Sequence, residues 1–216
     1  MINKSWHFST NIYHSKCLLF KKSNMRYVDG VAKPILWVDI DDVIFHLWPD
    51  LIKYYNLEYG EHKTLKDVWD IGSDQTYHII EKYNLYKNMM PTSILPVLKQ
   101  KRKDIYLIMV TSRKDIYVDE TMSELYAHWL DFDDIFMWEQ KSNVCRSENI
   151  NHFFDDALHN VIDVHKNAPN TKSYLVKRDW NNSEKLNTFR GKSINLPAGI
   201  ITLSEEELCK VLKDIC

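Results

Sequence analysis

Two carboxylates separated by one residue, Asp39 and Asp41, directly follow the apolar run Ile35–Val38. Carboxylates at this spacing in a loop can converge on one metal ion or one reacting group, and their repulsion is costly unless a cation or a shared proton relieves it. One could act as a nucleophile while its neighbour acts as an acid. An isolated pair of this kind is more often an acidic turn that caps a helix, so the interpretation needs support from elsewhere in the chain.

A second pair of carboxylates, Asp155 and Asp156, follows the apolar run 152–154 in the same way. Carboxylates delivered by neighbouring strand ends suit Mg²⁺, a hard cation that prefers oxygen ligands and keeps several waters. The sequence therefore predicts a Mg²⁺ site, with Asp39, Asp41, Asp155 and Asp156 as its candidate residues.

Groups that could hold a phosphate follow two other apolar runs. Thr111 and Ser112 come after the run 105–110, where hydroxyls and free backbone N–H groups suit phosphate oxygens, although each residue alone is more often a helix cap. Lys141 follows the next apolar run; a lysine can neutralise both a phosphate and an attacking carboxylate, but a single lysine is more often a surface residue. For Arg113 we expect a solvated position on the surface.

The elements that must position these side chains are short buried strands alternating with helices. Apolar runs predict strands at 35–38, 105–110, 135–138, 152–154 and 174–176 and near 199–201. Apolar spacing predicts helices at 94–101, at 119–130 (with Met122, Leu125, Tyr126 and Trp129 on one face) and at 157–166, and Ser204 with Glu207 predicts a capping box for a terminal helix. This alternation predicts an α/β fold, a doubly wound Rossmann-like parallel sheet whose ligands lie outside the carboxyl ends of the strands.

Composition and charge argue against several classes of protein. Hydrophobic residues make up 44% of the 216 residues, enough for a real core, and the formal net charge of -2 gives no general basic field for nucleic acid. No run approaches the ~20 apolar residues of a membrane span. We therefore expect neither a membrane nor a stably bound nucleic acid as a partner.

Cysteine and histidine spacing gives no sign of a disulfide framework or a zinc site. The four cysteines, Cys17, Cys145, Cys209 and Cys216, are scattered and form no C-x-x-C pair, which favours a cytoplasmic location. The histidines show no H-x-x-x-H spacing, and four of them are interpreted as ordinary helix residues: His78, His128, His159 and His165.

Taken in order, four segments resemble the four motifs of the haloacid dehalogenase-like (HAD) phosphatases: ILWVDIDDVI, IMVTSR, Lys141 and FFDDALHNV. The resemblance spans about residues 35–181 and implies a division of the chain. Residues 34–45 and 96–216 would form the HAD-like core domain, and 46–95 a small helical cap inserted after the first strand. Residues 1–33 have no clear hydrophobic period and are predicted as an N-terminal arm of uncertain order or an added edge strand.

The resemblance also implies a role for each candidate residue. Asp39 would be the nucleophile that forms an aspartyl-phosphate, and Asp41 would protonate the leaving oxygen and then activate water. Thr111 and Lys141 would hold the phosphoryl oxygens. The Mg²⁺ ligands would be Asp39, Asp155 and the backbone carbonyl of Asp41, with Asp156 supporting the metal shell.

Within that superfamily the chain most resembles the 5'(3')-deoxyribonucleotidase-like branch, through TSR, DDALHNV and YLVKRDWNN. The last segment has Asp179 where that branch frequently has proline, and the first motif has Asp42 where glycine is more common. The branch implies a phosphomonoesterase for nucleoside monophosphates. A sugar phosphate, another metabolite or a polynucleotide end are alternative substrates, and a catalytically silent binding or regulatory protein is the alternative of another class.

The predicted cap would select the substrate, which we expect to be a small phosphorylated molecule, preferentially a nucleotide. Four aromatic residues lie in or beside it: Phe45, Trp48, Trp69 and Tyr77. Stacking of a base on an aromatic ring is worth about 1–3 kcal/mol, so one or two of them could hold a nucleobase, although most aromatic residues of a chain belong to its core or surface. The sequence is compatible with a homodimer.

Overall fold

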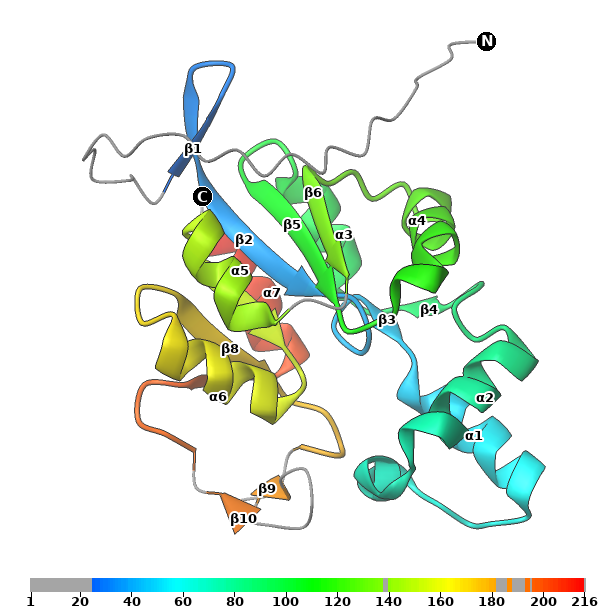
Figure 1. The fold of residues 1–216 in the computed structure, drawn as a ribbon. Coiled ribbons are helices and arrows are strands. Elements are labelled where there is room, and N and C mark those ends of the chain that lie inside the picture. Colours follow the sequence, from blue (N-terminus) through cyan, green and yellow to red (C-terminus); the bar gives the residue numbers. More distant parts are fainter. Residues whose placement is uncertain (1–24, 138–139, 182–185, 188–192, 195, 216) are drawn as a thin grey trace, which may run out of the picture.

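A parallel sheet lies at the centre of the larger part of the molecule (Figure 1). The computed structural model describes residues 25–137, 140–181, 186–187, 193–194 and 196–215. The strands of the sheet are β1 (Met25–Val28), β2 (Val31–Asp39), β5 (Tyr106–Thr111), β6 (Asp134–Met137), β7 (His152–Asp155), β8 (Lys172–Val176) and β11 (Ile201–Leu203). Six of them pair in parallel in the order β11-β8-β7-β2-β5-β6, and β1 pairs antiparallel with β2.

Helices cover both faces of this sheet. The helices of the core are α3 (Ile94–Lys101), α4 (Val118–Ala127), α5 (Lys141–Glu148), α6 (Leu158–Asn167) and α7 (Glu205–Asp214). Alternate residues of β2 enter different cores: Leu36 and Val38 pack with α3 and α7, whereas Ile35 and Trp37 pack with α5 and α6. A strand buried on both faces must be apolar throughout, which explains the unbroken apolar run before Asp39. The predicted doubly wound, Rossmann-like sheet is confirmed.

A group of helices is inserted between β2 and β5. The chain leaves through β3 (Phe45–His46) and returns through β4 (Met90–Pro91), which pair antiparallel with each other. Between them lie α1 (Trp48–Tyr59), the 3-10 helix η1 (Leu65–Asp70) and α2 (Ser73–Tyr83). These helices lie beside the carboxyl end of β2 (Figure 1). We refer to residues 47–89 as the cap; the wider range 46–95 predicted from the sequence contains all of it.

Asp42 joins the loop after β2 to the first helix of the cap. Its backbone is left-handed, with φ 57°, where glycine is usually preferred. Its carboxylate accepts hydrogen bonds from the N–H groups of Leu47, at 3.1 Å, and Trp48, at 3.2 Å, where α1 begins. The carboxylate therefore satisfies donors that a helix leaves unpaired at its start, and it lies at the end of the helix dipole that favours negative charge.

One ion pair contacts both segments that connect the cap to the core. Nε of Arg178 donates to the backbone oxygen of Asp42 at 2.6 Å, in the outgoing segment. Nη1 of Arg178 contacts Glu205 at 2.5 Å, and the other carboxylate oxygen of Glu205 accepts the N–H of Ser93, in the returning segment, at 2.5 Å. Glu205 also begins α7, so the core helix, β8 and both connections meet at this pair.

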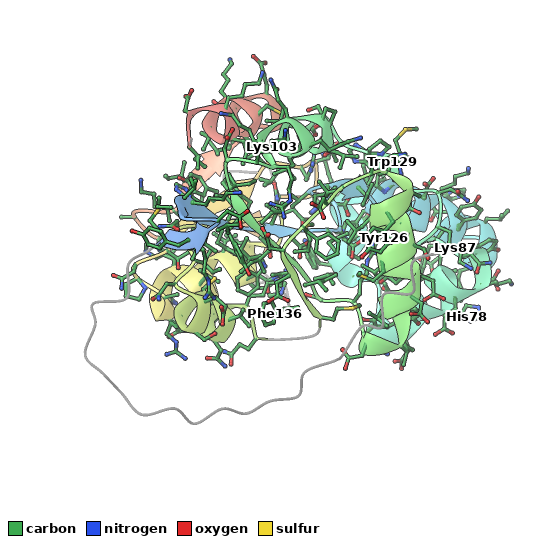
Figure 2. All side chains as sticks on the ribbon, turned by 90° about the horizontal axis from the view of Figure 1, so that it is seen from above. His78, Lys87, Lys103, Tyr126, Trp129 and Phe136 are labelled. Atoms are coloured by element: carbon green, nitrogen blue, oxygen red, sulfur yellow. The ribbon has the colours of Figure 1, made fainter. Side chains whose placement is uncertain are left out.

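The structure corrects the prediction for α4, which ends at Ala127 and not at residue 130. Trp129 adopts a left-handed backbone, with φ 55°, and its N–H bonds to the carbonyl of Tyr126, so the chain turns out of the helix. Leu125 and Leu130 are buried, but Tyr126 is 49% and Trp129 84% exposed (Figure 2). The prediction that these two aromatic residues share the apolar face was wrong: Tyr126 lies within the helix, but the buried face of α4 consists of Thr121, Glu124 and Leu125, and Trp129 follows the turn that ends the helix.

Most other bounds agree with the predictions to within one or two residues. The late strand begins at Ile201 because Gly199, with φ 100°, forms a turn before it, and a Cβ on this glycine would lie 3.0 Å from the ring of His165. Residue 138, the predicted end of the third strand, lies outside the described residues. The capping box of Ser204 and Glu207 at the start of α7 is confirmed.

Part of the predicted N-terminal arm forms a β-hairpin. Strand β1 pairs with the first half of β2 through a turn at Asp29 and Gly30, which have φ 52° and 80°. Two consecutive residues with positive φ are typical of the tight turns that match the twist of a hairpin. Residues 1–24 of the predicted arm lie outside the described residues. Over the described part of the chain, no helix has the length and apolar character needed to cross a bilayer.

Candidate active site

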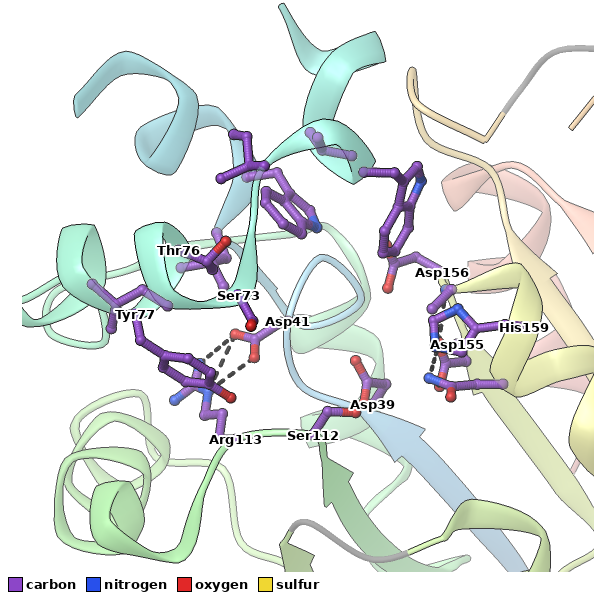
Figure 3. Close-up of a pocket in the computed structure, with 18 of the residues that line it drawn as sticks. Asp39, Asp41, Ser73, Thr76, Tyr77, Ser112, Arg113, Asp155, Asp156 and His159 are labelled. Atoms are coloured by element: carbon purple, nitrogen blue, oxygen red, sulfur yellow. Dashed lines mark hydrogen bonds and ion pairs between the residues drawn. The ribbon is translucent and has the colours of Figure 1, made fainter. Parts of the chain in front are cut away.

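Three buried carboxylates meet at the carboxyl ends of β2 and β7. Asp39, Asp155 and Asp156 each place one oxygen so that the three atoms lie within 4.8 Å of one another (Figure 3). The cause is the register of the sheet, since Val38 pairs with Phe154 in parallel and both strands therefore end at the same edge. We call these three residues the acid cluster.

Lys141, the first residue of α5, supplies a cation to the acid cluster. Its Nζ lies 2.5 Å from Oδ1 of Asp39 and 2.6 Å from Oδ2 of Asp155, and its side chain is buried. Burial alone would lower the pKa of Lys141, but the charges of Asp155 and Asp39 outweigh it and raise the pKa above its usual range, so the ammonium group stays charged. Lys141 thus lies within hydrogen-bond distance of both Asp39 and Asp155, and its catalytic role stays a prediction.

The acid cluster has more negative charge than Lys141 can balance. Burial raises the pKa of Asp39 well above its ordinary value in spite of Lys141, and the charges of Asp155 and Asp156 add to the increase. Burial, followed by the charge of Asp42, likewise raises the pKa of Asp156. Carboxylates crowded in this way are stabilised by a further cation, and hard oxygen donors are the ligands that Mg²⁺ prefers. The residues therefore fit a Mg²⁺ ion.

Neighbouring groups fix the orientation of the two carboxylates after β7. Asp155 accepts hydrogen bonds from the N–H of Ala157, at 2.7 Å, and from Nδ2 of Asn160, at 3.1 Å. Asp156 accepts a bond from Nε1 of Trp180, at 2.9 Å. Such contacts hold candidate metal ligands in place before a metal binds. Sequence reasoning missed Asn160 and Trp180, although both belong to the DDALHNV and YLVKRDWNN segments that it singled out.

Asp41 lies apart from the acid cluster and has its own cation. Its carboxylate is not one of the group within 4.8 Å; it forms a two-point ion pair with Arg113, whose side chain is only 1% exposed (Figure 3). The expectation that Arg113 is a solvated surface residue was therefore wrong. One sequence feature could have indicated this buried position. Arg113 comes two residues after the end of a strand, at the same edge of the sheet as the acids. The assignment of the Asp41 carbonyl to a metal stays a prediction.

Thr111 is the last residue of β5, and Ser112 follows it. Thr111 is fully buried, its hydroxyl accepts the N–H of Arg113 at 3.1 Å, and it does not line the pocket described next. Ser112 does line that pocket. Thr111 thus shapes the turn after the strand, and Ser112 is the hydroxyl that faces the open space.

A pocket of about 520 Å³ lies between the acid cluster and the cap. This volume falls in the range that small-molecule sites occupy, about 300–1,000 Å³. The core contributes its acids, Lys141 and Arg113. The cap contributes mainly aromatic and aliphatic side chains, among them Trp48, Trp69 and Tyr77, together with the polar residues Asp70, Ser73 and Thr76. The ring centroids of Trp48 and Trp69 lie 5.9 Å apart. The pocket therefore combines one charged wall and one aromatic wall.

Phe45 and His159 lie in environments that differ from those expected from the sequence. Phe45 is fully buried against the ring of His128 and does not line the pocket. His159 of α6 does line it, with its ring 5.8 Å from that of Trp69, and burial lowers its pKa. In the part of the chain that the structure covers, the acid cluster consists of carboxylates alone.

Comparisons with known proteins agree on the fold. No protein-family model matches the sequence, and no curated protein matches it. A haloacid dehalogenase-like family hydrolase from Streptococcus pneumoniae matches with a TM-score of 0.55 and 10% identity, over 82% of this chain and 97% of its own. A predicted phosphoglycolate phosphatase from Haemophilus somnus matches with a TM-score of 0.56 and 11% identity, over 85% of this chain and 98% of its own.

A HAD-superfamily hydrolase of subfamily IA from Geobacter sulfurreducens matches with a TM-score of 0.51 and 12% identity, over 83% of this chain and 96% of its own. At these identities the likeness concerns the fold. The fold resemblance expected from the four motifs is therefore confirmed, whereas nothing in these matches separates the nucleotidase-like branch from the others.

Proposed function

We propose that this chain is a Mg²⁺-dependent phosphomonoesterase that acts through an aspartyl-phosphate on Asp39. The observation that carries the proposal is the meeting of Asp39, Asp155 and Asp156 around Lys141 at the edge of a HAD-like sheet. These residues come from three separate parts of the chain, and the pairing of β2 with β7 brings the acids to one edge of the sheet.

The proposed reaction has two displacements at phosphorus. In the first, an Asp39 carboxylate oxygen bonds to phosphorus while the bond to the leaving oxygen breaks, and Asp41 gives that oxygen its proton. In the second, Asp41 takes a proton from water, the water oxygen bonds to phosphorus, and the bond to Asp39 breaks, which releases inorganic phosphate and restores both residues. Lys141 neutralises charge on Asp39 and on the phosphoryl oxygens.

The remaining groups bind and orient the substrate. Asp39, Asp155 and the Asp41 carbonyl would hold Mg²⁺, with Asp156 supporting them. When bound, the ion would offset negative charge on the transferred group. Ser112 lines the pocket and is placed to donate to a phosphoryl oxygen, and Thr111 fixes the turn that presents the backbone N–H groups beside it.

The pocket favours a substrate with one phosphate and a flat, uncharged leaving group. Among the described residues that line it, the lysines and arginines are Lys141 and Arg113, and each already pairs with carboxylates of the site. Among these lining residues, no lysine or arginine is left over for a second phosphate or a carboxylate on the substrate. The rings of Trp48, Trp69 and Tyr77 offer stacking surfaces for a base. A nucleoside monophosphate, with a deoxyribose or a ribose, fits these features.

Phosphate release from a substrate panel, with and without Mg²⁺, tests the proposal. We expect Mg²⁺-dependent turnover that Asp39→Asn abolishes, whereas Asp104→Asn, at an exposed position outside the pocket, leaves it unchanged. Full activity of Asp39→Asn would remove this residue from the mechanism. Mg²⁺ binding without turnover of any phosphate ester would favour a binding or regulatory protein.

The substrate assignment is tested separately by kcat/KM values. Deoxy- and ribonucleoside monophosphates should exceed sugar phosphates, phosphoglycolate and 5'-phosphorylated oligonucleotides. If a sugar phosphate equals or exceeds every nucleotide, the nucleotidase assignment fails while the phosphatase remains.

A further inference from the structure

Arg113 and Asp41 form the most completely buried ion pair on the pocket wall outside the acid cluster. Nη2 of Arg113 lies 2.6 Å from Oδ1 of Asp41, and Nε lies 3.0 Å from Oδ2 and 3.2 Å from Oδ1. The carboxylate is 20% exposed and borders the pocket, whereas the guanidinium lies behind it, 1% exposed. A planar guanidinium that contacts both oxygens fixes the plane of a carboxylate as well as its position.

The guanidinium is itself held from several sides. Nη1 donates to Oγ1 of Thr121 at 3.1 Å, and Nη2 contacts Sδ of Met89 at 3.1 Å. The ring of Tyr86 covers the guanidinium carbon at 3.9 Å from the ring centroid. Thr121 belongs to α4, and Tyr86 and Met89 belong to the cap. A side chain so enclosed has few alternative positions, so it can serve as a fixed support for its partner.

The two aspartates of the loop thus receive different cations. Lys141 contacts Asp39, and Arg113 contacts Asp41, whose carboxylate stays outside the acid cluster. This separation matters for the proposed reaction, because a residue that transfers protons must reach the leaving oxygen and must not be captured by the metal site. Oδ1 receives the shortest contact from Arg113, and Oδ2 is contacted by Nε alone. Oδ2 therefore keeps a lone pair that Arg113 does not occupy, and this lone pair is where Asp41 binds the transferred proton.

We propose that Arg113 is the positioning residue for proton transfer by Asp41: it holds the Asp41 carboxylate away from the acid cluster, with Oδ2 turned to the leaving oxygen. The inference rests on the proposed phosphatase function. In this role Arg113 contacts the Asp41 carboxylate and does not itself bind the substrate or exchange a proton. It acts on the first displacement, where the proton moves from Oδ2 of Asp41 to the leaving oxygen as the bond from that oxygen to phosphorus breaks.

The dependence of kcat/KM on the leaving group tests this role. A 4-nitrophenolate leaves without a proton, whereas phenolate and, above all, an alkoxide need one. Phenyl phosphate and 4-nitrophenyl phosphate have similar size, so binding differences are small. The constant kcat/KM reports the first irreversible step and therefore the departure of the leaving group.

Arg113→Gln should lower kcat/KM for an alkyl phosphate about 100-fold or more, the lower end of what proton transfer contributes, and for 4-nitrophenyl phosphate less than about 10-fold. Phenyl phosphate should lie between them. Arg113→Lys keeps the charge without the two-point contact and should restore part of the loss. Lys114→Gln is the control, because it removes a neighbouring positive charge that lies over Tyr77 and not on Asp41. It should change kcat/KM only slightly and by the same factor for all three substrates.

Asp41→Asn provides a second test of the same role. It should show the same leaving-group pattern, and adding Arg113→Gln to it should cause little further loss on the alkyl phosphate, because both variants remove one function. An equal loss on all three substrates by Arg113→Gln, or losses that multiply in the double variant, would overturn the inference. Thr121→Val, which keeps the ion pair but removes one support of the guanidinium, gives the same test in a milder form if Arg113→Gln does not fold.

The two proposals fail differently. If Asp39→Asn is inactive and Arg113→Gln slows every substrate equally, the phosphatase stands and the role of Arg113 is wrong. If Asp39→Asn keeps its activity, the proposed function itself is wrong.

Discussion

The two walls of the pocket differ in both chemistry and construction. On the core side, charged groups such as Asp39, Asp155 and Lys141 are buried and held by direct contacts at the ends of strands and at the start of a helix. On the cap side, Trp48 and Trp69 offer two rings whose centroids lie 5.9 Å apart. The rigid sheet therefore carries the groups that need exact placement, and the insertion carries those that need only a surface.

This difference assigns separate tasks to the walls. The core wall should govern whether any phosphate ester reacts, and the cap wall should govern which ester reacts fastest. Variants on the two sides should accordingly differ in the size of their effect and in its dependence on the substrate.

The largest effect should come from Asp39→Asn on the core wall. Without a nucleophile no aspartyl-phosphate forms, so kcat should fall at least about 1,000-fold for every substrate. A single-turnover assay with quenching should detect covalent phosphate on the wild-type chain and none on the variant. A loss confined to nucleotides would contradict the division between the walls.

The metal site should give the next largest effect. Chelation should abolish activity, and Asp156→Asn should weaken the apparent affinity for Mg²⁺ about 10- to 100-fold, the range typical of residues that support metal ligands. Titration of activity with Mg²⁺ measures this shift. Saturating Mg²⁺ should restore most of the activity of this variant, and it should not restore Asp39→Asn.

A smaller, substrate-dependent effect is expected on the cap wall. Trp69→Ala should cost about 1–3 kcal/mol in kcat/KM for a nucleotide if its ring stacks on the base, which is roughly 5- to 150-fold. Glycerol phosphate, which has no ring, should be almost unaffected. Trp129→Ala, at an exposed position 84% accessible to solvent, is the matched control. Equal losses on both substrates would show that Trp69 supports the fold of the cap and not the substrate.

The smallest effect concerns the core far from the cap, at His152 of β7. Burial lowers the pKa of His152 to about 4, compared with an ordinary value of 6.5. The unfolded chain therefore binds a proton at a higher pH than the folded chain, so this residue should lower the free energy of unfolding as the pH falls from about 7 toward 4. Urea unfolding of the wild type and His152→Gln at pH 7 and pH 5 should show a smaller pH dependence in the variant.

The placement of the acids on the core wall was largely predictable from sequence, and the reason is geometric. Parallel strands end at one edge of a sheet, so the sequence could place the acids after the apolar runs at 35–38 and 152–154 on that edge. That the two strands are neighbours was not predicted and comes from the observed sheet order. The meeting of Asp39 with Asp155 needs no information about side-chain direction beyond this. The same rule explains why Lys141, at the start of the helix after β6, reaches both acids.

Sequence reasoning failed where the direction of one side chain decides its environment. Arg113 follows a strand end, as a surface residue could, and only the folded structure shows its guanidinium turned inward to Asp41. Trp129 has the spacing of a buried helical residue but follows the end of the helix. The role of Asp42 at the start of α1 was equally hidden, since it depends on a left-handed backbone that no spacing encodes.

The ion pair of Arg178 and Glu205 has a mechanical consequence. Because it contacts Asp42 on one connection and Ser93 on the other, a rotation of either connection would disturb a contact that both share. Arg178 is also two residues from Trp180, which donates to Asp156. The loop after β8 therefore joins the connections of the cap, through Arg178, to a carboxylate of the acid cluster, through Trp180.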